Sequence, residues 1–293
     1  MSNTENKRPV PATAGVIGWP IAHSQSPALH RFWLEACGIN GDYSRFPVHP
    51  DHLAQAIKAL PAWGMRGVNV TVPHKQAVIP LLDEIDPLAK KAGAVNIVRV
   101  AEDGRLQGYN SDITGFMEAL QPAIKAQGAG LRKAFIVGAG GAARAVALGL
   151  TEAGFTCQIV NRNFEKARAL ARDIGALRGD IEFHSLEDNR EPEFTLQDGE
   201  LGVIVNATTL GMSGQPPLDL SLEKVDPRSL VYDIVYVPLE TPLLKAAKAR
   251  GMQTIDGLSM LIGQAAAAFE LFYDRKPPRD QDQALRALLT KKA

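Results

Sequence analysis

The stretch KAFIVGAGGAARAVALG, residues 133–149, decides the fold class. Five mostly apolar residues, 133–137, are typical of a buried strand, and the small residues after them open an apolar helix. Gly138, Gly140 and Ala143 form the pattern GxGxxA, in which a tight turn, a close approach of backbone to ligand and close helix packing each require a small residue. Because the free amides at a helix N-terminus attract phosphate, the stretch predicts a strand, turn and helix that bind a dinucleotide. A glycine-rich turn without a ligand is the alternative interpretation.

The end of the next predicted strand, TCQIV at 156–160, indicates which dinucleotide is bound. It is followed by Asn161, Arg162 and Asn163, at the place where a site for NAD usually presents an acidic side chain. A guanidinium forms paired, charge-assisted hydrogen bonds with a phosphate, so Arg162, supported by Lys166, favours the 2′-phosphate of NADP. The alternative is that Arg162 is an ordinary solvated surface charge.

Apolar segments typical of strands alternate with amphipathic segments along the rest of the chain. Further strands are expected at 14–20, 67–73, 202–208 and 229–236, and an amphipathic helix is expected over 258–272. A helix is also expected after Asp86, an N-cap residue, with Pro87 in its first position. The polar stretch 184–201 is expected to be a surface loop. Such alternation predicts parallel α/β sheets, whose ligands bind beyond the carboxyl ends of the strands.

Length and composition limit the class of protein. At roughly 150 residues per domain, 293 residues favour two domains. The chain has 32 Lys plus Arg and 32 Asp plus Glu, so its zero net charge attracts neither nucleic acid nor an anionic membrane, and the expected partner is a small molecule. No apolar run reaches the length of about 18 residues that a membrane span needs, and the polar opening MSNTENKRP lacks a signal-peptide core, so a cytoplasmic location is expected. Cys37 and Cys157 are expected to be buried, and no metal site is expected from the spacing of His and Cys.

Polar side chains lie at the ends of the predicted strands within the first 112 residues. They are Ser24, Ser26, Thr71, Lys75, Asn96 and Asp112. Hydroxyls and amides bind substrate hydroxyls in fixed directions, and neighbouring serines suit a carboxylate, so the set predicts a polyhydroxylated anion as substrate. Single residues of the set have ordinary alternatives: Ser26 before Pro27 is also a common N-cap arrangement, Thr71 could face solvent and Asn96 could be a turn residue.

Lys75 and Asp112 are the candidates for chemistry. Reduction of a ketone by hydride creates an alkoxide that must receive a proton, and Lys75 is the expected donor. Asp112 would orient the ammonium and share its charge. The alternative is a surface ion pair of little energetic consequence.

Nine stretches of the chain, in order, resemble those of the shikimate dehydrogenase family over residues 14–275. They are IAHSQSPALH, NVTVPHK, AGAVNIV, YNSDITGF, VGAGGAARA, VNRN, NATTLGM, YDIVY and DGLSMLIGQAA. The resemblance implies a two-domain α/β fold, with a substrate-binding domain of mainly parallel sheet at 1–112, completed by 247–293, and a Rossmann-like NADP-binding domain at 113–246. It also implies an NADP-dependent oxidoreductase that reversibly reduces 3-dehydroshikimate to shikimate with NADPH, in the supply of aromatic amino acid precursors.

The resemblance also assigns roles to residues. By resemblance, the substrate is bound by Ser24, Ser26, Thr71, Asn96, Asp112, Tyr236 and Gln264, with Lys75 as the acid and base paired with Asp112. By resemblance, NADP is held by Gly138, Ala139, Gly140, Gly141, Ala142, Asn161, Arg162, Asn163 and Lys166, with Ile234 and Gly257 beside the nicotinamide. Helical periodicity alone places Gln264 on the solvated flank of its helix, so its role rests on the resemblance.

Two other functions stay open at this point. The same chemistry on quinate, or on both acids, requires only small changes around Ser26 and Tyr236. A nucleotide-sensing protein without turnover is the alternative from another class, because a fold does not determine a function. The sequence is compatible with a monomer or a homodimer.

Overall fold

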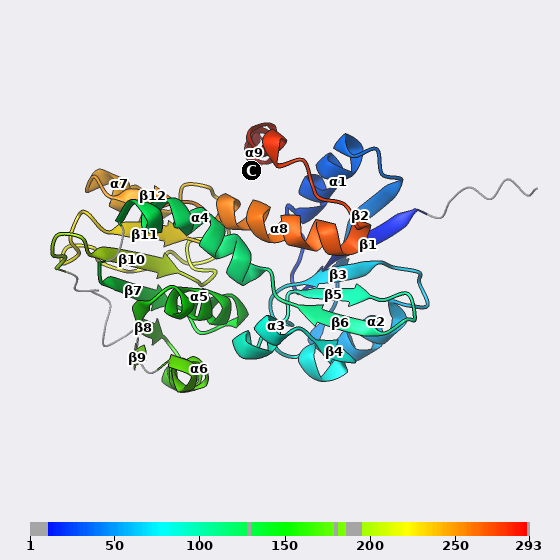
Figure 1. Cartoon of the computed structure of the whole chain (residues 1–293), viewed down its shortest axis with the longest axis horizontal. Coiled ribbons are helices and arrows are strands. Elements are labelled where there is room, and N and C mark those ends of the chain that lie inside the picture. The colour runs from blue at the N-terminus through cyan, green and yellow to red at the C-terminus, as the bar shows by residue number, and fades with distance from the viewer. Residues whose placement is uncertain (1–10, 128–129, 179–180, 186–194, 292–293) are drawn as a thin grey trace, which may run out of the picture.

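The computed structural model describes residues 11–127, 130–178, 181–185 and 195–291 of the chain. Two six-stranded sheets form two lobes that lie side by side along the long axis of the molecule (Figure 1). The strand order is β2-β1-β3-β5-β6-β4 in the first lobe and β12-β11-β10-β7-β8-β9 in the second. Helices cover both sheets, so the expected two-domain α/β architecture is confirmed.

The first sheet is parallel except for one strand. Its members are β1 (Ala12–Gly18), β2 (Gly41–Pro47), β3 (Gly67–Val70), β4 (Glu84–Ile85), β5 (Ile97–Val100) and β6 (Leu106–Tyr109). β1 runs parallel to β2 and β3, and β4 runs parallel to β6. β5 runs antiparallel to β3 and to β6, because residues 101–105 are too short a connection to β6 to form a parallel crossover.

The reversed direction of β5 has a functional consequence. Asn69 of β3 lies opposite Ile97, the first residue of β5, and Ile97 lies opposite Tyr109 at the end of β6. The beginning of β5 therefore lies at the same edge of the sheet as the ends of β3 and β6. Asn96, which precedes β5, is thereby brought to the edge where the predicted substrate residues gather.

Among the residues described before residue 112, the first lobe contains three α-helices, and only one of them is capped by a side chain. They are α1 (Ser26–Ala36), α2 (Leu53–Ala59) and α3 (Pro87–Ala92), with single 3₁₀ turns at Pro50–His52 and Ile79–Leu81. The predicted start of α3 is confirmed, because the Asp86 carboxylate accepts a hydrogen bond from the Leu88 amide at 2.9 Å and Pro87 is the first helical residue. α3 ends at Gly93, whose φ of 61° is the left-handed conformation that glycine adopts at little cost.

The second sheet is parallel throughout. Its strands are β7 (Arg132–Val137), β8 (Phe155–Asn161), β9 (Ile181–Ser185), β10 (Leu201–Asn206), β11 (Leu230–Asp233) and β12 (Gln253–Ile255). Its helices are α4 (Asp112–Gln127), α5 (Gly141–Glu152), α6 (Phe164–Arg178) and α7 (Pro242–Ala249). β7, the first strand of this sheet along the chain, lies between β8 and β10, so the strand order reverses there. Ligands of such sheets bind at this reversal, directly beyond the end of β7.

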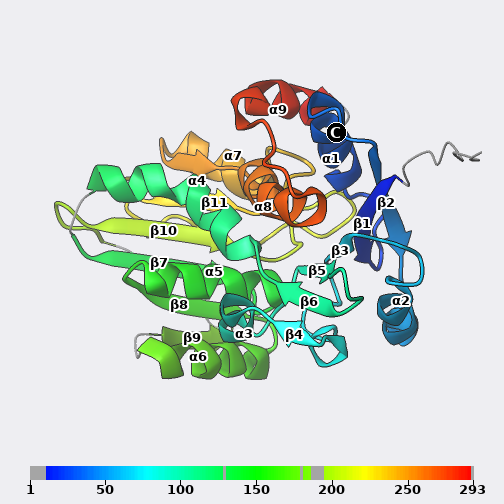
Figure 2. The same ribbon diagram turned by 45° about the vertical axis from the view of Figure 1, so that its right-hand side comes forward.

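The chain returns to the first lobe after β12. Helix α8 (Gly257–Tyr273) lies between the lobes, against α4 on one side and α1 on the other, and a 3₁₀ turn (Arg279–Gln281) leads to α9 (Asp282–Lys291) (Figure 2). The predicted boundary between residues 246 and 247 falls within α7, which packs on β11 and β12 of the second sheet. We therefore propose that the second domain extends through Ile255.

Two glycines let α4 and α8 touch. A Cβ atom on Gly115 of α4 would lie 2.4 Å from the backbone nitrogen of Gln264, and one on Gly263 of α8 would lie 2.9 Å from the Gly115 Cα. The helix backbones are therefore in direct contact at this crossing. The crossing determines where Gln264 lies.

The surface loop and the burial of the two cysteines differ in part from expectation. The surface loop expected over 184–201 begins later than predicted, because residues up to Ser185 belong to β9, which pairs with β8, and residues 186–194 lie outside the described part of the chain. Cys157 is buried as expected, whereas Cys37 is half-buried.

None of the described helices is both long enough and apolar enough to cross a membrane.

Replacement of Gly115 by Ala is expected to lower the free energy of unfolding by about 1–3 kcal/mol, because the new methyl group overlaps the backbone of α8 and cannot be relieved by a rotamer change. Denaturant unfolding measures this. Thr114→Ala, at the exposed neighbouring position of α4, is the control and should change stability little. A Gly115→Ala protein as stable as the parent would contradict the close crossing.

Candidate active site

A cleft of about 360 Å³ lies between the two lobes, at the edges where their strands end. It is lined by eight residues expected to bind substrate, namely Ser24, Ser26, Thr71, Lys75, Asn96, Asp112, Tyr236 and Gln264. Ala142, Ile234 and Gly257, expected at the cofactor, line it as well. The structure thus brings together side chains from both ends of the chain.

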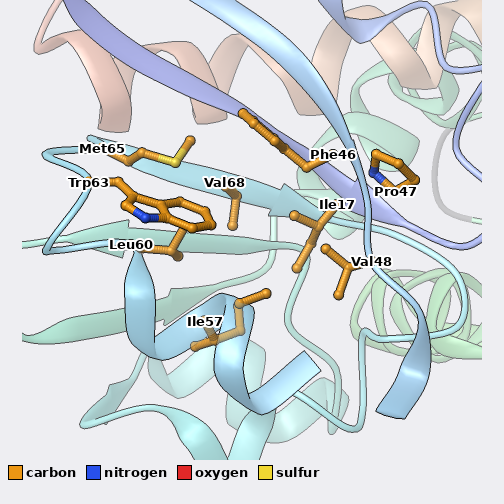
Figure 3. A pocket seen from close by; sticks show the side chains of 10 residues that line it. Ile17, Phe46, Pro47, Val48, Ile57, Leu60, Trp63, Met65 and Val68 are labelled. Atoms are coloured by element: carbon orange, nitrogen blue, oxygen red, sulfur yellow. The ribbon is translucent and has the colours of Figure 1, made fainter. Parts of the chain in front are cut away.

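A second hollow, of about 200 Å³, lies between the first sheet and α2 (Figure 3). Its walls include Ile17, Phe46, Leu60 and Trp63, a residue that is 62% exposed. The lining contains no charged side chain and no side-chain hydroxyl or amide. Such a surface cannot bind a hydroxylated anion, so the interlobe cleft is the candidate site.

Lys75 and Asp112 form a buried ion pair in the cleft. Lys75 Nζ donates to Asp112 Oδ2 at 2.5 Å, and the two side chains are only 12% and 5% exposed. Asn96 Nδ2 donates to the other carboxylate oxygen of Asp112 at 2.9 Å. The alternative of a solvated surface pair is therefore wrong. The carboxylate holds the ammonium in one orientation, with little water to screen the charges.

Asn69 also lines the cleft, although the sequence analysis did not select it. Its side-chain amide donates to the Asn96 carbonyl at 3.2 Å, and its oxygen accepts from the buried Tyr43 hydroxyl at 2.7 Å. The pattern of 67–73 contained a signal, because Asn69 and Thr71 are two residues apart and share the polar face of the strand. Ser111, whose amide donates to Asn96 Oδ1 at 2.8 Å, was missed for want of any such pattern.

Ser24 and Ser26 lie together at the beginning of α1. Ser24 Oγ donates to Ser26 Oγ at 3.2 Å, and both residues are buried. Ser26 is the first helical residue rather than the N-cap, which is Gln25, so the N-cap alternative is wrong. Arg45 donates to the Ser24 carbonyl at 2.8 Å and brings positive charge near this wall. The wall therefore suits a carboxylate.

Tyr236 and Gln264 close the cleft from the second lobe and from α8. Burial raises the pKa of the Tyr236 phenol above its usual value, while hydrogen bonds with the Gln25 backbone and the Ser24 side chain oppose the rise, so the hydroxyl stays neutral. Gln264 is half-buried and donates to the Leu261 carbonyl at 2.9 Å. Helical periodicity placed Gln264 on a solvated flank of α8. That flank faces the cleft instead, because α8 crosses α4 at the Gly115 contact.

The glycine turn after β7 has the space that a dinucleotide requires. Gly138 has φ of 119°, and a Cβ atom there would lie 2.9 Å from Thr208 Cγ2 on the neighbouring turn after β10. Gly140, the N-cap of α5, has open space where a Cβ would be. Gly141 packs directly on the aliphatic part of Lys75, since its Cβ would lie 2.8 Å from Lys75 Cβ. The free amides of α5 thus open beside the ion pair, and the cradle fits a pyrophosphate.

The residues expected at the 2′-phosphate lie outside the cleft. Asn161 ends β8, the neighbour of β7, and its side chain donates to the Asn163 carbonyl at 2.9 Å. Arg162 and Lys166 are exposed at the same edge of the sheet as the glycine turn. Their side chains are free to reach a phosphate from solvent.

A buried carboxylate, which the sequence analysis missed, holds the opposite wall. Asp233 at the end of β11 accepts from Asn206 Nδ2 at 3.0 Å, from the Val235 amide at 3.0 Å and from Thr241 Oγ1 at 2.7 Å. Asn206 in turn accepts from the Thr208 hydroxyl at 2.7 Å. The network joins the turns after β10 and β11, which carry Thr208 and Ile234 into the cleft. The sequence contained a signal for this network, because the apolar strands β10 and β11 each end in a polar residue, Asn206 and Asp233.

Burial raises the pKa of Asp233 to about 6, although its three hydrogen bonds oppose the rise. The folded protein therefore binds this proton more tightly than the unfolded chain, and the contribution of Asp233 to stability falls as the pH rises from about 4 to 6. Asp233→Asn removes this dependence. Between pH 4.5 and 7 the variant should gain about 2 kcal/mol of unfolding free energy relative to the parent, measured by denaturant unfolding at each pH. A constant difference across that range would contradict the raised pKa.

Three family models match the chain. They are described as the shikimate dehydrogenase substrate binding domain, over residues 16–98, shikimate / quinate 5-dehydrogenase, over 123–192, and the shikimate 5'-dehydrogenase C-terminal domain, over 257–285. The resemblance inferred from the nine stretches is confirmed by these matches.

Named relatives agree with the family models. The chain is 47% identical over 275 residues to a shikimate dehydrogenase (NADP(+)) of Rhodospirillum rubrum. The aligned region covers 94% of this chain and 95% of that one. A crystal structure of shikimate 5-dehydrogenase from Thermus thermophilus in complex with NADP(H) and shikimate is 38% identical, with a TM-score of 0.77, over 94% of this chain and 99% of that one. A quinate dehydrogenase from Corynebacterium glutamicum in complex with NAD is 33% identical, with a TM-score of 0.80, over 94% and 99% of the two chains. The chain belongs to the shikimate dehydrogenase family.

Proposed function

We propose that the chain catalyses the reversible, NADPH-dependent reduction of 3-dehydroshikimate to shikimate. One observation carries the proposal. A buried ammonium, held by a carboxylate at 2.5 Å, lies between a polar cleft and the glycine turn of a dinucleotide-binding unit. This arrangement supplies a proton donor at the place where a hydride acceptor would meet its donor.

Each part of the cleft has a place in this reaction. NADP, when bound, supplies or receives the hydride, and the turn 138–142 would hold its pyrophosphate, with Ile234 and Gly257 beside the nicotinamide. Lys75 gives a proton to the oxygen of the ketone as it becomes an alkoxide, and takes it back in the reverse direction. Asp112 keeps the ammonium directed into the cleft, and Asn96 holds Asp112 through its other oxygen.

The polar lining accounts for binding of the substrate. We assign the carboxylate of the substrate to Ser24 and Ser26, whose wall carries the positive charge of Arg45. The amides and hydroxyls of Asn69, Thr71 and Gln264 would bind the ring hydroxyls, since each presents donors and acceptors in fixed directions. Tyr236, as a neutral phenol, would donate from the second lobe.

Shikimate is favoured over quinate, because the relatives at 42–47% identity are named shikimate dehydrogenase (NADP(+)). The buried Lys75–Asp112 pair favours an enzyme over a sensor, since two charges are costly to bury without a use. A cytoplasmic location and a monomeric or homodimeric state stay predictions of the sequence.

Replacement of Lys75 by Ala should lower kcat by about 10²–10⁴-fold, while the KM for substrate changes much less, because proton transfer belongs to the transition state. Nicotinamide absorbance during shikimate oxidation measures both constants. Lys91→Ala, which removes an exposed lysine paired with Glu152, is the matched control and should retain full activity. A Lys75→Ala enzyme with unimpaired kcat would overturn the assigned role.

Replacement of Arg162 by Asp should raise the KM for NADP at least tenfold and leave the KM for NAD unchanged or lower, because a carboxylate repels the 2′-phosphate and can bind ribose hydroxyls. Steady-state kinetics with each cofactor measures the shift. Arg168→Asp, an exposed arginine on α6 beside Glu165, controls for the change in charge. Retained preference for NADP in Arg162→Asp would contradict the assignment.

A further inference from the structure

A buried arginine joins the two lobes beside the active site. Arg144 lies in α5, three residues after Gly141, and its side chain is only 9% exposed. Its Nε donates to the Ala92 carbonyl at 2.6 Å, and one of its terminal nitrogens donates to Asp173 of α6 at 2.7 Å. Ala92 is the last residue of α3, in the first lobe. The guanidinium thus connects the cofactor helix to a helix of the substrate lobe.

The contact with α3 is specific. The last carbonyls of a helix have no partner within it. Those of Ala89 and Lys90 are satisfied by the amides that follow α3, and that of Ala92 is satisfied by Arg144 from the other lobe. A cation at this end also interacts favourably with the helix dipole. A Cβ atom on Gly93 would lie 2.8 Å from a terminal nitrogen of Arg144, so the guanidinium lies directly against the turn after α3.

That turn leads directly to the catalytic pair. The Val95 amide donates to the Lys75 carbonyl at 2.8 Å, which attaches the turn to the backbone of the lysine. Asn110 donates to the Ala94 carbonyl at 2.9 Å and accepts from the Asp112 amide at 3.0 Å, which attaches the turn to the aspartate. Displacement of the turn would therefore move both members of the pair.

Helix α5 also touches the pair directly, one turn before Arg144. Gly141 opens α5 and packs on the side chain of Lys75, as described above. The first turn of α5 therefore offers its free amides to a pyrophosphate and contacts the surroundings of the ion pair at two points. Gly141 packs on Lys75, and Arg144 contacts the end of α3.

We propose that Arg144 is a positioning residue that holds the cofactor lobe and the Lys75–Asp112 pair at the separation that the reaction needs. The proposal rests on the proposed function. Most of the residues assigned to each ligand belong to one lobe, but hydride and proton must reach one carbonyl group together. A displacement of about 1 Å can lower the rate of such a step about 100-fold.

The test compares turnover with binding in Arg144→Met and Arg144→Lys. Methionine keeps much of the length but no donor, whereas lysine keeps the charge without the fork of two hydrogen bonds. Arg144→Met should lower kcat at least tenfold, and the Kd of NADPH and of shikimate, each titrated alone, should change less than threefold. The deuterium isotope effect on kcat with 4-deuterated NADPH should increase, and Arg144→Lys should be intermediate.

Two controls separate this role from general stabilisation. Lys91→Ala removes an exposed ion pair with Glu152, 3.4 Å long, from the same contact between α3 and α5. Asp173→Asn removes the ion pair of Arg144 and leaves its bond with Ala92. Both should keep kcat within threefold of the parent.

The outcomes are distinguishable. Retention of kcat within twofold in Arg144→Met overturns the positioning role, and so does a loss of kcat matched by an equal loss of affinity for both ligands. An Asp173→Asn variant as slow as Arg144→Met also overturns it, because the contact with α6 would then be responsible. Should Arg144→Met fail to fold, judged by circular dichroism, Arg144→Lys decides by the same criteria. A parent protein that does not oxidise shikimate overturns the proposed function itself.

Discussion

Two opposite charges, taken out of water and held together between two lobes, are the constraint on which this structure depends. Burial of an ammonium and a carboxylate costs several kcal/mol each unless their remaining hydrogen-bonding groups are satisfied. Asn96 satisfies the second oxygen of Asp112, and Ser111 holds Asn96. The polar edge of the first sheet is thus one connected network. This network holds the Lys75 ammonium in one direction, and the directed ammonium is what allows the cleft to transfer a proton as well as bind a ligand.

Close contact between the lobes requires small residues at a few defined positions. Gly141 lies against Lys75, Gly93 lies against Arg144, and Gly115 lies against the backbone of α8. At each position a side chain would push apart two parts of the molecule that form the site. The second lobe has its own buried anchor, Asp233, which joins the turns on the nicotinamide side. The cleft is therefore built by contacts within each lobe and by close contacts between parts of the molecule at these small residues.

The sequence predicted the parts of the fold that depend on local chemistry. The strand, turn and helix over 133–149, the capped start of α3 at Asp86 and the strand before Thr71 are each encoded within a few residues, and all are found. Six of the residues that line the cleft were also predicted as a set, because polar side chains at the ends of apolar strands are conspicuous in the sequence, whereas Tyr236 and Gln264 came only from the family resemblance. The reversal of β5 and the extent of β9 were not predicted, since each depends on which strand a segment pairs with.

Local patterns in the chain were enough to predict a two-lobed α/β protein, a phosphate-binding turn and a lysine and an aspartate available for proton transfer, because strand periodicity, small residues in turns and residue chemistry are local properties. The three-dimensional arrangement was needed to establish that these two side chains are 2.5 Å apart, that Gln264 faces the cleft and that Arg144 spans the lobes. These facts depend on strand order and on the crossing of α4 with α8. Such contacts join residues far apart in the chain, and no local pattern specifies the distance between them.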